Sequence, residues 1–398
     1  MKSSMKWNAD TVQVLTFHKN VLGILGLWVL DEKNLFSRIR WFMSTVIEMS
    51  ATISLSLEVI RHCKSHEDTL NAFLSASTSV ISISKLLLHR LNWRHKLILV
   101  EHIIHDWTFV KDDSSRDIML KYARRGRFGA MLFLSLGFTS CVFLFSSLLF
   151  GDMKMPWDDY EEQIYNNTHE RRLLLAAYCV FGTYTSFTYG LIEILQSLQI
   201  LVNCISQCGN DGFFFDLTMH VCGQFEILRT DFAAMDCEKL LYRVQLVNLL
   251  KRHYRLIYMA HHLKKAFDAV ILAQLFMSVM LLCVEGFQLL LTLATNETFA
   301  AMRHMLFIVV LLVQLFIYCF AGQTLESESE ELAYAIYRSP WYCFDVDTMK
   351  NLPLMILRAT SPHQLTAGKF LVINFVSFKE ILKASASYLS VLRVMLDT

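Results

Sequence analysis

The chain has 398 residues, of which 54% are hydrophobic and only 18% are charged, and its formal net charge is +1. In a soluble domain about a quarter of the residues are charged, so this composition excludes an ordinary soluble globular protein. The balanced charge gives no electrostatic reason to expect a nucleic-acid partner.

The first apolar run, Val21–Leu30 (VLGILGLWVL), is too short to cross a bilayer. It also lacks a basic start and a small-residue cleavage site, so no cleavable signal peptide is expected. We predict a helix that lies on the membrane surface, within a cytoplasmic N-terminal segment covering residues 1–40.

Longer apolar runs recur along the rest of the chain, which predicts an all-α integral membrane protein. Hydropathy predicts seven transmembrane helices: Trp41–Ile60, Leu70–Leu88, Phe128–Phe150, Leu173–Leu195, Ala269–Thr292, Met305–Gly322 and Phe370–Val391. The apolar pattern of the fourth span continues to about Ile205, so that helix should project from the bilayer. The last span is the weakest, because Lys379, Glu380 and Lys383 interrupt it.

The distribution of Lys and Arg predicts the orientation of these helices. Both residues concentrate in the N-terminal segment and in the links that follow the second and fourth spans. Cytoplasmic links carry the excess of basic residues, so the N-terminus should be cytoplasmic and the C-terminus extracellular. The two glycosylation sequons, at Asn166 and Asn296, both fall on links that this count places outside. A G-protein-coupled receptor has its N-terminus outside, so this topology argues against that class.

The ten cysteines do not follow a metal-binding pattern. Cys204 and Cys208 lack a set of histidine partners, so we predict no metal site. Cys141, Cys179, Cys283 and Cys319 lie in apolar spans, where we expect free buried thiols. The sequence also lacks a nucleophile–base set and a phosphate-binding glycine loop, so we predict no catalytic residue and no cofactor.

The segment Leu325–Tyr337 continues from the sixth span without a helix breaker and becomes acidic. Its apolar residues form a stripe at helical spacing, and a helix with such a stripe needs other helices to pack against in water. We expect an intracellular helical assembly that includes the extended fourth helix and the region Phe213–Met259. The alternative is a solvated acidic linker.

Four motifs make the chain similar to the insect odorant receptors, and together they cover nearly its full length. The first is Cys319-x-x-Gly322-x-x-Leu325-x-x-x-Ser329-x-x-Leu332-x-x-Ala335-x-Tyr337-x-x-x-Trp341-Tyr342. The second is the C-terminal LTAGKF…FKEILKASASYLSVLR. The others are GILGLWVL near the N-terminus and His220-x-x-x-Gln224-x-x-x-Leu228.

This resemblance implies an odour-tuning subunit of a ligand-gated, non-selective cation channel, in which four subunits surround a pore. The partner subunit would be a co-receptor, which contacts this chain through an intracellular anchor. Both would lie in the dendritic plasma membrane of olfactory sensory neurons, in contact with membrane lipids. The chain lacks the long insertion in the second cytoplasmic link that marks the co-receptor. The implied domains are the segment 1–40, the ligand-binding bundle 41–205, the anchor link 206–268, spans five and six at 269–323, the anchor helix and loop 324–364, and the pore helix with the extracellular tail at 365–398. The implied anchor residues are His220, Gln224, Ser329, Leu332, Tyr337, Trp341 and Tyr342.

The resemblance places the hydrophobic gate of the pore at Val391. Ala384, Ser387, Val391 and Val394 share one helical face and are small or medium in size, so they can border a narrow conduit that closes by dewetting. The alternative is that this face packs against neighbouring helices.

The resemblance also places a pocket for a small volatile, apolar ligand in the outer half of the bilayer. Aromatic residues with a few polar groups suit such a ligand, although aromatic residues of membrane helices commonly pack or face lipid. The candidates are Phe73, Leu74, Ser77, Phe138, Cys141, Phe145, Phe181, Tyr184, Phe187, Gln288, His304 and Phe307.

Two acids, Glu48 and Glu285, lie within predicted spans, where a charge is costly unless it faces protein or water. Each could contact a cation or a ligand amine, or be a neutral group hydrogen-bonded to a neighbouring helix. Two alternatives to an odour-gated channel stay open: a homotetrameric gustatory-type channel and a membrane transporter. A transporter would be expected to contain inverted repeats, which the sequence does not show.

Overall fold

The computed structural model describes residues 8–62, 66–110, 112–150, 173–181, 186–235 and 239–396. Helices dominate, as the sequence predicts, and two short strands pair in an antiparallel hairpin. The elements are α1 (Ala9–Ile24), η1 (Val29–Asp31), α2 (Leu35–Arg61), α3 (His66–Leu91), α4 (Trp93–Phe109), α5 (Asp113–Phe150), α6 (Tyr178–Phe181), α7 (Ser186–Ala233), α8 (Lys239–Ala294), α9 (Thr298–Arg338), η2 (Trp341–Cys343), α10 (Val346–Met349), α11 (Leu352–Ala359), β1 (Thr366–Ala367), β2 (Leu371–Val372) and α12 (Phe375–Leu396).

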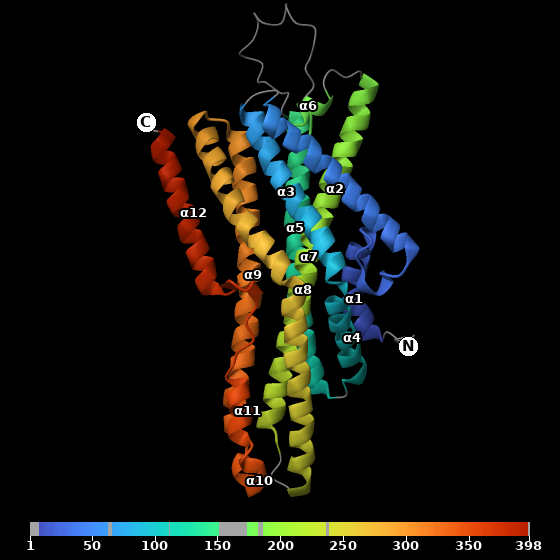
Figure 1. The fold of residues 1–398 in the computed structure, drawn as a ribbon, viewed down its shortest axis with the longest axis vertical. Coiled ribbons are helices and arrows are strands. Elements are labelled where there is room, and N and C mark those ends of the chain that lie inside the picture. Colours follow the sequence, from blue (N-terminus) through green and yellow to red (C-terminus); the bar gives the residue numbers. More distant parts are fainter. Residues whose placement is uncertain are drawn as a thin grey trace, which may run out of the picture.

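The molecule is an elongated bundle in which α7, α8 and α9 run most of its length (Figure 1). The upper part in this view contains α2, α3, the C-terminal part of α5 and α12. The lower part contains α4, α10 and α11 beside the lower halves of the three long helices. The turn between α8 and α9, α6 and the C-terminal end of α12 lie together at the upper end. This arrangement is the one expected if the upper end is outside and the lower end is the intracellular anchor.

Six helices of the described residues are long and apolar enough to cross a membrane: α2, α3, α5, α7, α8 and α9. The seventh predicted span, α12, is helical but does not meet the same charge limit. Every stretch of 18 residues within α12 contains Lys379, Glu380 and Lys383. The weakness predicted for this span is therefore a real property of the helix.

Some predicted boundaries are wrong. The fourth span was expected to begin at Leu173, but residues 173–177 are not helical and the long helix begins at Ser186. That helix then continues to Ala233, far beyond Ile205, because the lower half of the bundle buries it. The last helix begins at Phe375 instead of Phe370, since the hairpin of β1 and β2 precedes it. The predicted domain limits at 205, 268 and 323 lie within α7, α8 and α9, as they must if these helices continue out of the membrane, and they stay predictions.

The predicted surface helix over Val21–Leu30 is also wrong. The helix is α1, which ends at Ile24, and Gly26 follows with a φ of +69°. The N–H of Leu27 donates to the carbonyl of Leu22 at 2.8 Å, which is the bond of a Schellman motif. This turn directs Leu27 and Trp28 into the core, where both are buried. Most apolar side chains of this run therefore pack in the protein, whereas Ile24 and Leu30 are exposed.

The apolar core is distributed unequally along the bundle. One large cluster, from Leu15 to Ile373, joins α1, α3, α4, α5, α7, α8, α9 and α11, mainly in the lower part. Residues 209–219 of α7 are buried without interruption, which places α7 at the centre of this cluster. Two much smaller clusters, one containing Cys141 and the other containing Leu74, lie in the upper part. The lower part is therefore the better packed of the two.

Candidate functional site

The predicted ligand residues do not meet in one place, because α3 separates them into two groups. Cys141 of α5 is buried in a cluster with Ala72 and Ala76 of α3 and Ile200 of α7, and Phe145 packs against it. Leu74, on another face of α3, packs instead with Leu281 of α8. The outer half of the bundle thus has two small apolar clusters on either side of α3.

The remaining predicted ligand residues occupy different environments. Ser77, Gln288 and His304 are buried, whereas Phe73 and Phe307 are half-buried. Phe138 and Phe187 are 45% and 76% exposed, so both side chains point away from the interior of the isolated chain. Tyr184 and the side chain of Phe181 lie outside the described residues.

A polar cluster joins α8 and α9 next to the Leu74 group. Glu285 and His304 are 2.7 Å apart between Oε2 and Nδ1, and both side chains are buried. One turn from Glu285, the buried Nε2 of Gln288 has no hydrogen-bond partner among the described residues. Arg303 donates to Oδ1 of Asn71 in α3 at 3.3 Å. The intramembrane acid Glu285 is therefore paired with a neighbouring helix, and Gln288 keeps a donor for another group.

The second intramembrane acid, Glu48, also faces protein. Its Oε2 accepts a hydrogen bond from Asn203 of α7 at 3.4 Å, while Oε1 is buried without a partner in the described part of the chain. The contact joins α2 to α7. Both intramembrane acids thus follow the interpretation in which a neighbouring helix supplies the partner.

The non-helical segment 173–177 closes the outer end of the Cys141 cluster. Leu173, Leu175 and Ala177 are buried, and the side chain of Gln196 binds both backbone groups of Leu175, at 3.1 Å to the N–H and 3.0 Å to the carbonyl. Glu58 of α2 accepts the N–H of Cys179 at 2.7 Å. Such backbone is stable at membrane depth only where protein groups satisfy it. Gln196 and Glu58 were missed by the sequence analysis, although polar residues inside apolar spans were the available signal.

The predicted pore helix, α12, lies at the edge of the bundle and contacts α8 and α9 (Figure 1). Gly286 of α8 seats Leu389, since a Cβ at this glycine would lie 2.6 Å from the Leu389 side chain. Ala384, Ser387 and Val391 are exposed on the protomer, with Val391 58% exposed. The side chain of Val394 lies outside the described residues.

The base of α12 is fixed to the long helices. Gly322, a residue of the Cys319–Tyr342 motif, has no room for a side chain, because a Cβ would lie 1.9 Å from the carbonyl oxygen of Ile373. Thr366 of the hairpin donates to Asp268 of α8 at 2.7 Å. The helix α12 is therefore attached to both α8 and α9 at its lower end.

The predicted anchor residues on α9 and η2 divide into buried and exposed sets. Leu332 is fully buried, and the Ser329 hydroxyl accepts the N–H of His363 at 2.9 Å. Tyr337 and Tyr342 are exposed, while Trp341 packs against the large core and donates to the carbonyl of Tyr337 at 3.0 Å. The apolar stripe of Leu325–Tyr337 is thus largely buried in a helical assembly, and the alternative of a solvated linker is wrong.

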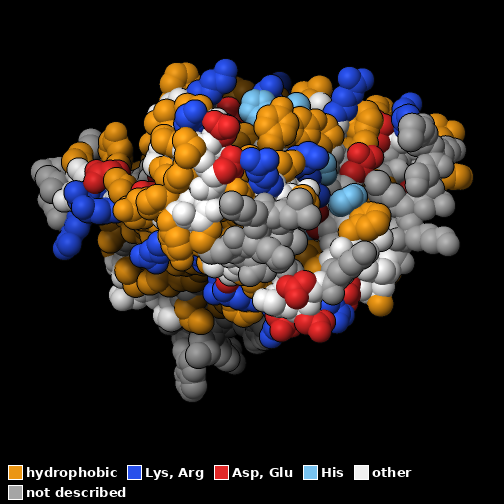
Figure 2. Space-filling model, turned by 90° about the horizontal axis from the view of Figure 1, so that it is seen from below, with side chains coloured by type: hydrophobic (Ala, Val, Ile, Leu, Met, Phe, Trp, Pro, Cys, Tyr) orange, Lys and Arg blue, Asp and Glu red, His pale blue; other side chains and the backbone are white. Residues whose placement is uncertain are grey.

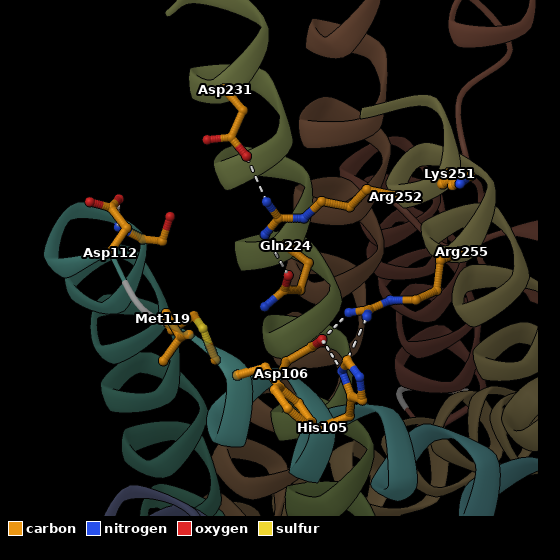
Figure 3. A pocket seen from close by; sticks show the side chains of 12 residues that line it. His105, Asp106, Asp112, Met119, Gln224, Asp231, Lys251, Arg252 and Arg255 are labelled. Carbon is orange, nitrogen blue, oxygen red and sulfur yellow. Dashed lines mark hydrogen bonds and ion pairs between the residues drawn. The ribbon is translucent and has the colours of Figure 1, made fainter. Parts of the chain in front are cut away.

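Gln224 lines a cleft of about 610 Å³ between α4, the start of α5, α7 and α8, and His220 adjoins it (Figure 3). Asp106 of α4 binds Arg255 of α8 and lies 3.1 Å from His220, whose pKa is lowered to about 4 by burial. Arg252 bridges Asp231 at 2.6 Å and Gln224 at 3.1 Å. The motif His220-x-x-x-Gln224 therefore supplies the polar contacts through which α7 holds α4 and α8.

This cleft does not present an excess of charge. Its cations, Lys251, Arg252 and Arg255, are matched by Asp106, Asp112 and Asp231. Arg252 pairs with Asp231 and Arg255 pairs with Asp106, and burial raises the pKa of Asp231. The network serves to join helices and gives no preference for an anionic ligand.

The described residues contain no group of three or more His, Cys, Asp or Glu side chains placed to hold a metal ion. Cys179 is disulfide-bonded, so the expectation of a free thiol at this position is wrong. The free cysteines of the described part are Cys141, Cys204, Cys208, Cys222, Cys283 and Cys319.

The chain is similar to known proteins in sequence and in fold. The sequence model of the 7tm Odorant receptor family matches residues 65–386. Odorant receptor 10a of Drosophila melanogaster is 24% identical over 345 residues, which cover 81% of each chain. Odorant receptor 22c of the same organism is 26% identical over 199 residues, and this match covers 47% of the chain and about half, 48%, of the relative.

The structure of the olfactory receptor OR5 from the insect Machilis hrabei, in complex with eugenol, has the same fold. The TM-score is 0.79 with 14% identity, and the alignment covers 97% of this chain and 100% of that receptor. The prediction of an all-α integral membrane protein is thereby confirmed, as is the resemblance drawn from the four motifs. The chain belongs to the insect odorant receptor family and is a multi-pass membrane protein.

Proposed function

We propose that the chain is an odour-tuning subunit of a ligand-gated, non-selective cation channel that opens together with an odorant receptor co-receptor. The observation that carries this proposal is the polar surface of α12 at the edge of the bundle. Lys379, Glu380 and Lys383 are exposed on the protomer. Charges that face lipid are costly, so this side of α12 requires water or another subunit beside it.

The same surface supports a pore. Ala384, Ser387 and Val391 follow each other at helical spacing and are exposed. A ring of small and apolar side chains around a shared axis can close by dewetting, with Val391 as the gate. Leu389, on another face, packs on α8 and would transmit movements of that helix.

The lower end of the molecule supports assembly with other subunits. Seen from below, hydrophobic side chains are interspersed with charges of both signs (Figure 2). Val346 of α10 and Leu354 and Leu357 of α11 are exposed there, as are Tyr337 and Tyr342. Apolar residues exposed in a cytoplasmic region suit a protein–protein contact, and we assign them to the anchor interface with the co-receptor.

The outer half of the bundle supports binding of a small, mainly apolar, volatile molecule. The two clusters beside α3 offer apolar surface, and Gln288 offers a buried hydrogen-bond donor that the described residues leave unpaired. A few polar groups within apolar walls fix the orientation of such ligands. Family membership supports a place in the plasma membrane of olfactory sensory neurons, and Asn296, exposed in the α8–α9 turn, is a glycosylation candidate on the outer side.

The proposal is tested by expressing the chain in an electrically silent cell, with and without a co-receptor, and recording current across a panel of volatiles. We expect odour-evoked cation current only when both are present. Current from the chain alone would instead indicate a homotetrameric, gustatory-type channel, and current that depends on G-protein signalling would contradict channel function. For the gate, Val391→Ala should increase ligand-free current at unchanged surface expression, and unchanged currents would contradict its assignment.

A further inference from the structure

Four helices meet at a cluster of buried polar side chains that belongs neither to the candidate ligand residues nor to the candidate pore residues. Asp211 of α7 is bound by Lys85 of α3 at 2.6 Å and by the Tyr318 hydroxyl of α9 at 2.6 Å. Gln314 of α9 donates to the second carboxylate oxygen and accepts from Gln274 of α8 at 3.0 Å. We call these five residues the Asp211 hub.

The hub should hold its four helices firmly together. Lys85, Asp211, Gln274 and Tyr318 are all buried, with exposed fractions of 2% or less. Hydrogen bonds to a carboxylate are stronger than neutral ones, and a buried charge that loses its partners is strongly destabilising. The rings of Phe214 and Tyr318 also stack, with 4.9 Å between their centroids, and this contact further joins α7 to α9. Any displacement of α3 or α7 must therefore move α9 or break charged hydrogen bonds.

The hub also lies next to the attachments of α12. One turn along α9 from Tyr318 is Gly322, which seats the backbone of Ile373 at the base of α12. On α8, Gln274 lies fewer than two turns from Asp268, which binds Thr366 of the hairpin. The two helices that carry α12 are thus the two that the hub joins to α3 and α7.

We propose that Asp211 is a positioning residue that couples the outer ligand region to the pore helix. A ligand between the upper halves of α3, α5, α7 and α8 shifts α3 and α7, and the hub passes that shift to α8 and α9 at the base of α12. This inference rests on the proposed channel function. On this proposal, the hub determines the efficacy of a ligand, which is the extent to which the bound ligand opens the pore.

The test uses the full chain with a co-receptor and measures three quantities: surface amount, ligand-free current, and odour-evoked current with its half-maximal concentration. Asp211→Asn keeps the shape of the side chain and removes its charge. We expect the ratio of odour-evoked to ligand-free current to fall about five-fold or more per molecule at the surface. Lys85→Met should act in the same direction, and the double variant should lose less than the sum of the two, because the residues act as one unit.

Asp216→Asn is the matched control. Asp216 is a buried carboxylate on the same helix, but its partner is His18 of α1, at 3.4 Å, and not a residue of α8 or α9. This variant should change the surface amount as much as Asp211→Asn does and leave the current ratio unchanged. Equal loss of the ratio in both variants would overturn the proposal, because it would indicate general destabilisation.

Tyr318→Phe provides the decisive variant if Asp211→Asn does not reach the surface. It removes one hydroxyl and keeps the ring that stacks on Phe214, so folding should persist. We expect a reduced current ratio at normal surface amount, and a wild-type ratio would overturn the coupling. Absence of odour-evoked current in the wild-type chain with co-receptor is a separate result, which would contradict the proposed function itself.

Discussion

The anchor half and the outer half of the bundle are built from the same long helices but packed in different ways. In the anchor, one continuous apolar cluster joins eight helices around the buried segment 209–219 of α7. In the outer half, two small clusters lie on either side of α3, and polar pairs such as Glu285–His304 supplement them. Regions with few buried apolar contacts open at a lower free-energy cost than continuous cores. Under the proposed function, we expect the anchor to serve assembly and the outer half to carry ligand-driven movement.

Removal of a core side chain in the anchor should have the largest effect. Leu332→Ala should lower the free energy of unfolding by about 2–5 kcal/mol, because Leu332 is fully buried and its loss leaves a cavity. The measurement is the thermal unfolding of the purified receptor. Tyr334→Ala on the same helix, where the side chain is 61% exposed, should leave the unfolding temperature almost unchanged. Equal effects of the two variants would remove the distinction between anchor core and surface.

Loss of the Gln196 side-chain amide should have a smaller effect on stability and a larger one on ligand response. Gln196→Leu breaks both hydrogen bonds to the backbone of Leu175 and should cost about 1–3 kcal/mol locally, since two buried backbone groups lose their partner. The opening should be confined to segment 173–177, which closes the Cys141 cluster. Hydrogen exchange should therefore increase in this segment, while the anchor keeps its protection. The odour concentration that gives half-maximal current should also change. Uniformly increased exchange would contradict separate behaviour of the two halves.

Acidification should weaken the anchor. The pKa values of His253 and His363 are lowered to about 4, first by burial and then by the nearby Arg358. Between the usual pKa of about 6.5 and 4 the unfolded chain binds more protons than the folded chain, so stability is complete above pH 6.5 and falls toward pH 4.

Each of these histidines should change the free energy of unfolding by at most about 1.4 kcal/mol per pH unit in that window. Unfolding temperatures between pH 7.5 and 5 measure the effect. His253→Gln and His363→Gln should each reduce the pH dependence, whereas His261→Gln, which alters an exposed side chain, should not. If both buried variants keep the wild-type pH dependence, these histidines do not control anchor stability.

The sequence predicts the membrane architecture and the packing of α9 well. Hydropathy identifies the apolar helices, and the apolar stripe of α9 indicates a face that other helices must cover. The four motifs also identified the family, and the structure gives a physical reason for Gly322, whose position admits no side chain beside Ile373. The non-helical segment 173–177 was not predictable from hydropathy. Its buried leucines have the same apolar character as a span, and its stability depends on side chains distant in the chain.

The site was harder to predict than the fold. Hydropathy places residues at a depth in the bilayer but does not say which face of a helix they occupy, so Phe138 and Phe187 were included although both are exposed. The division of Leu74 from Cys141 depends on the rotation of α3, which tertiary packing decides. The Asp211 hub joins residues of four helices and could not be derived from local patterns.

The central claim is that α12 lines a water-filled path shared between subunits. Its most direct test is Val391→Cys in the chain expressed with a co-receptor, exposed to a charged, membrane-impermeant thiol reagent during odour application. Leu389→Cys, where the native side chain packs on Gly286 of α8, is the matched control. We predict that the reagent reduces the odour-evoked current through the Val391→Cys receptor and leaves the Leu389→Cys receptor unaffected. Full current through a surface-expressed Val391→Cys receptor after treatment would contradict the claim.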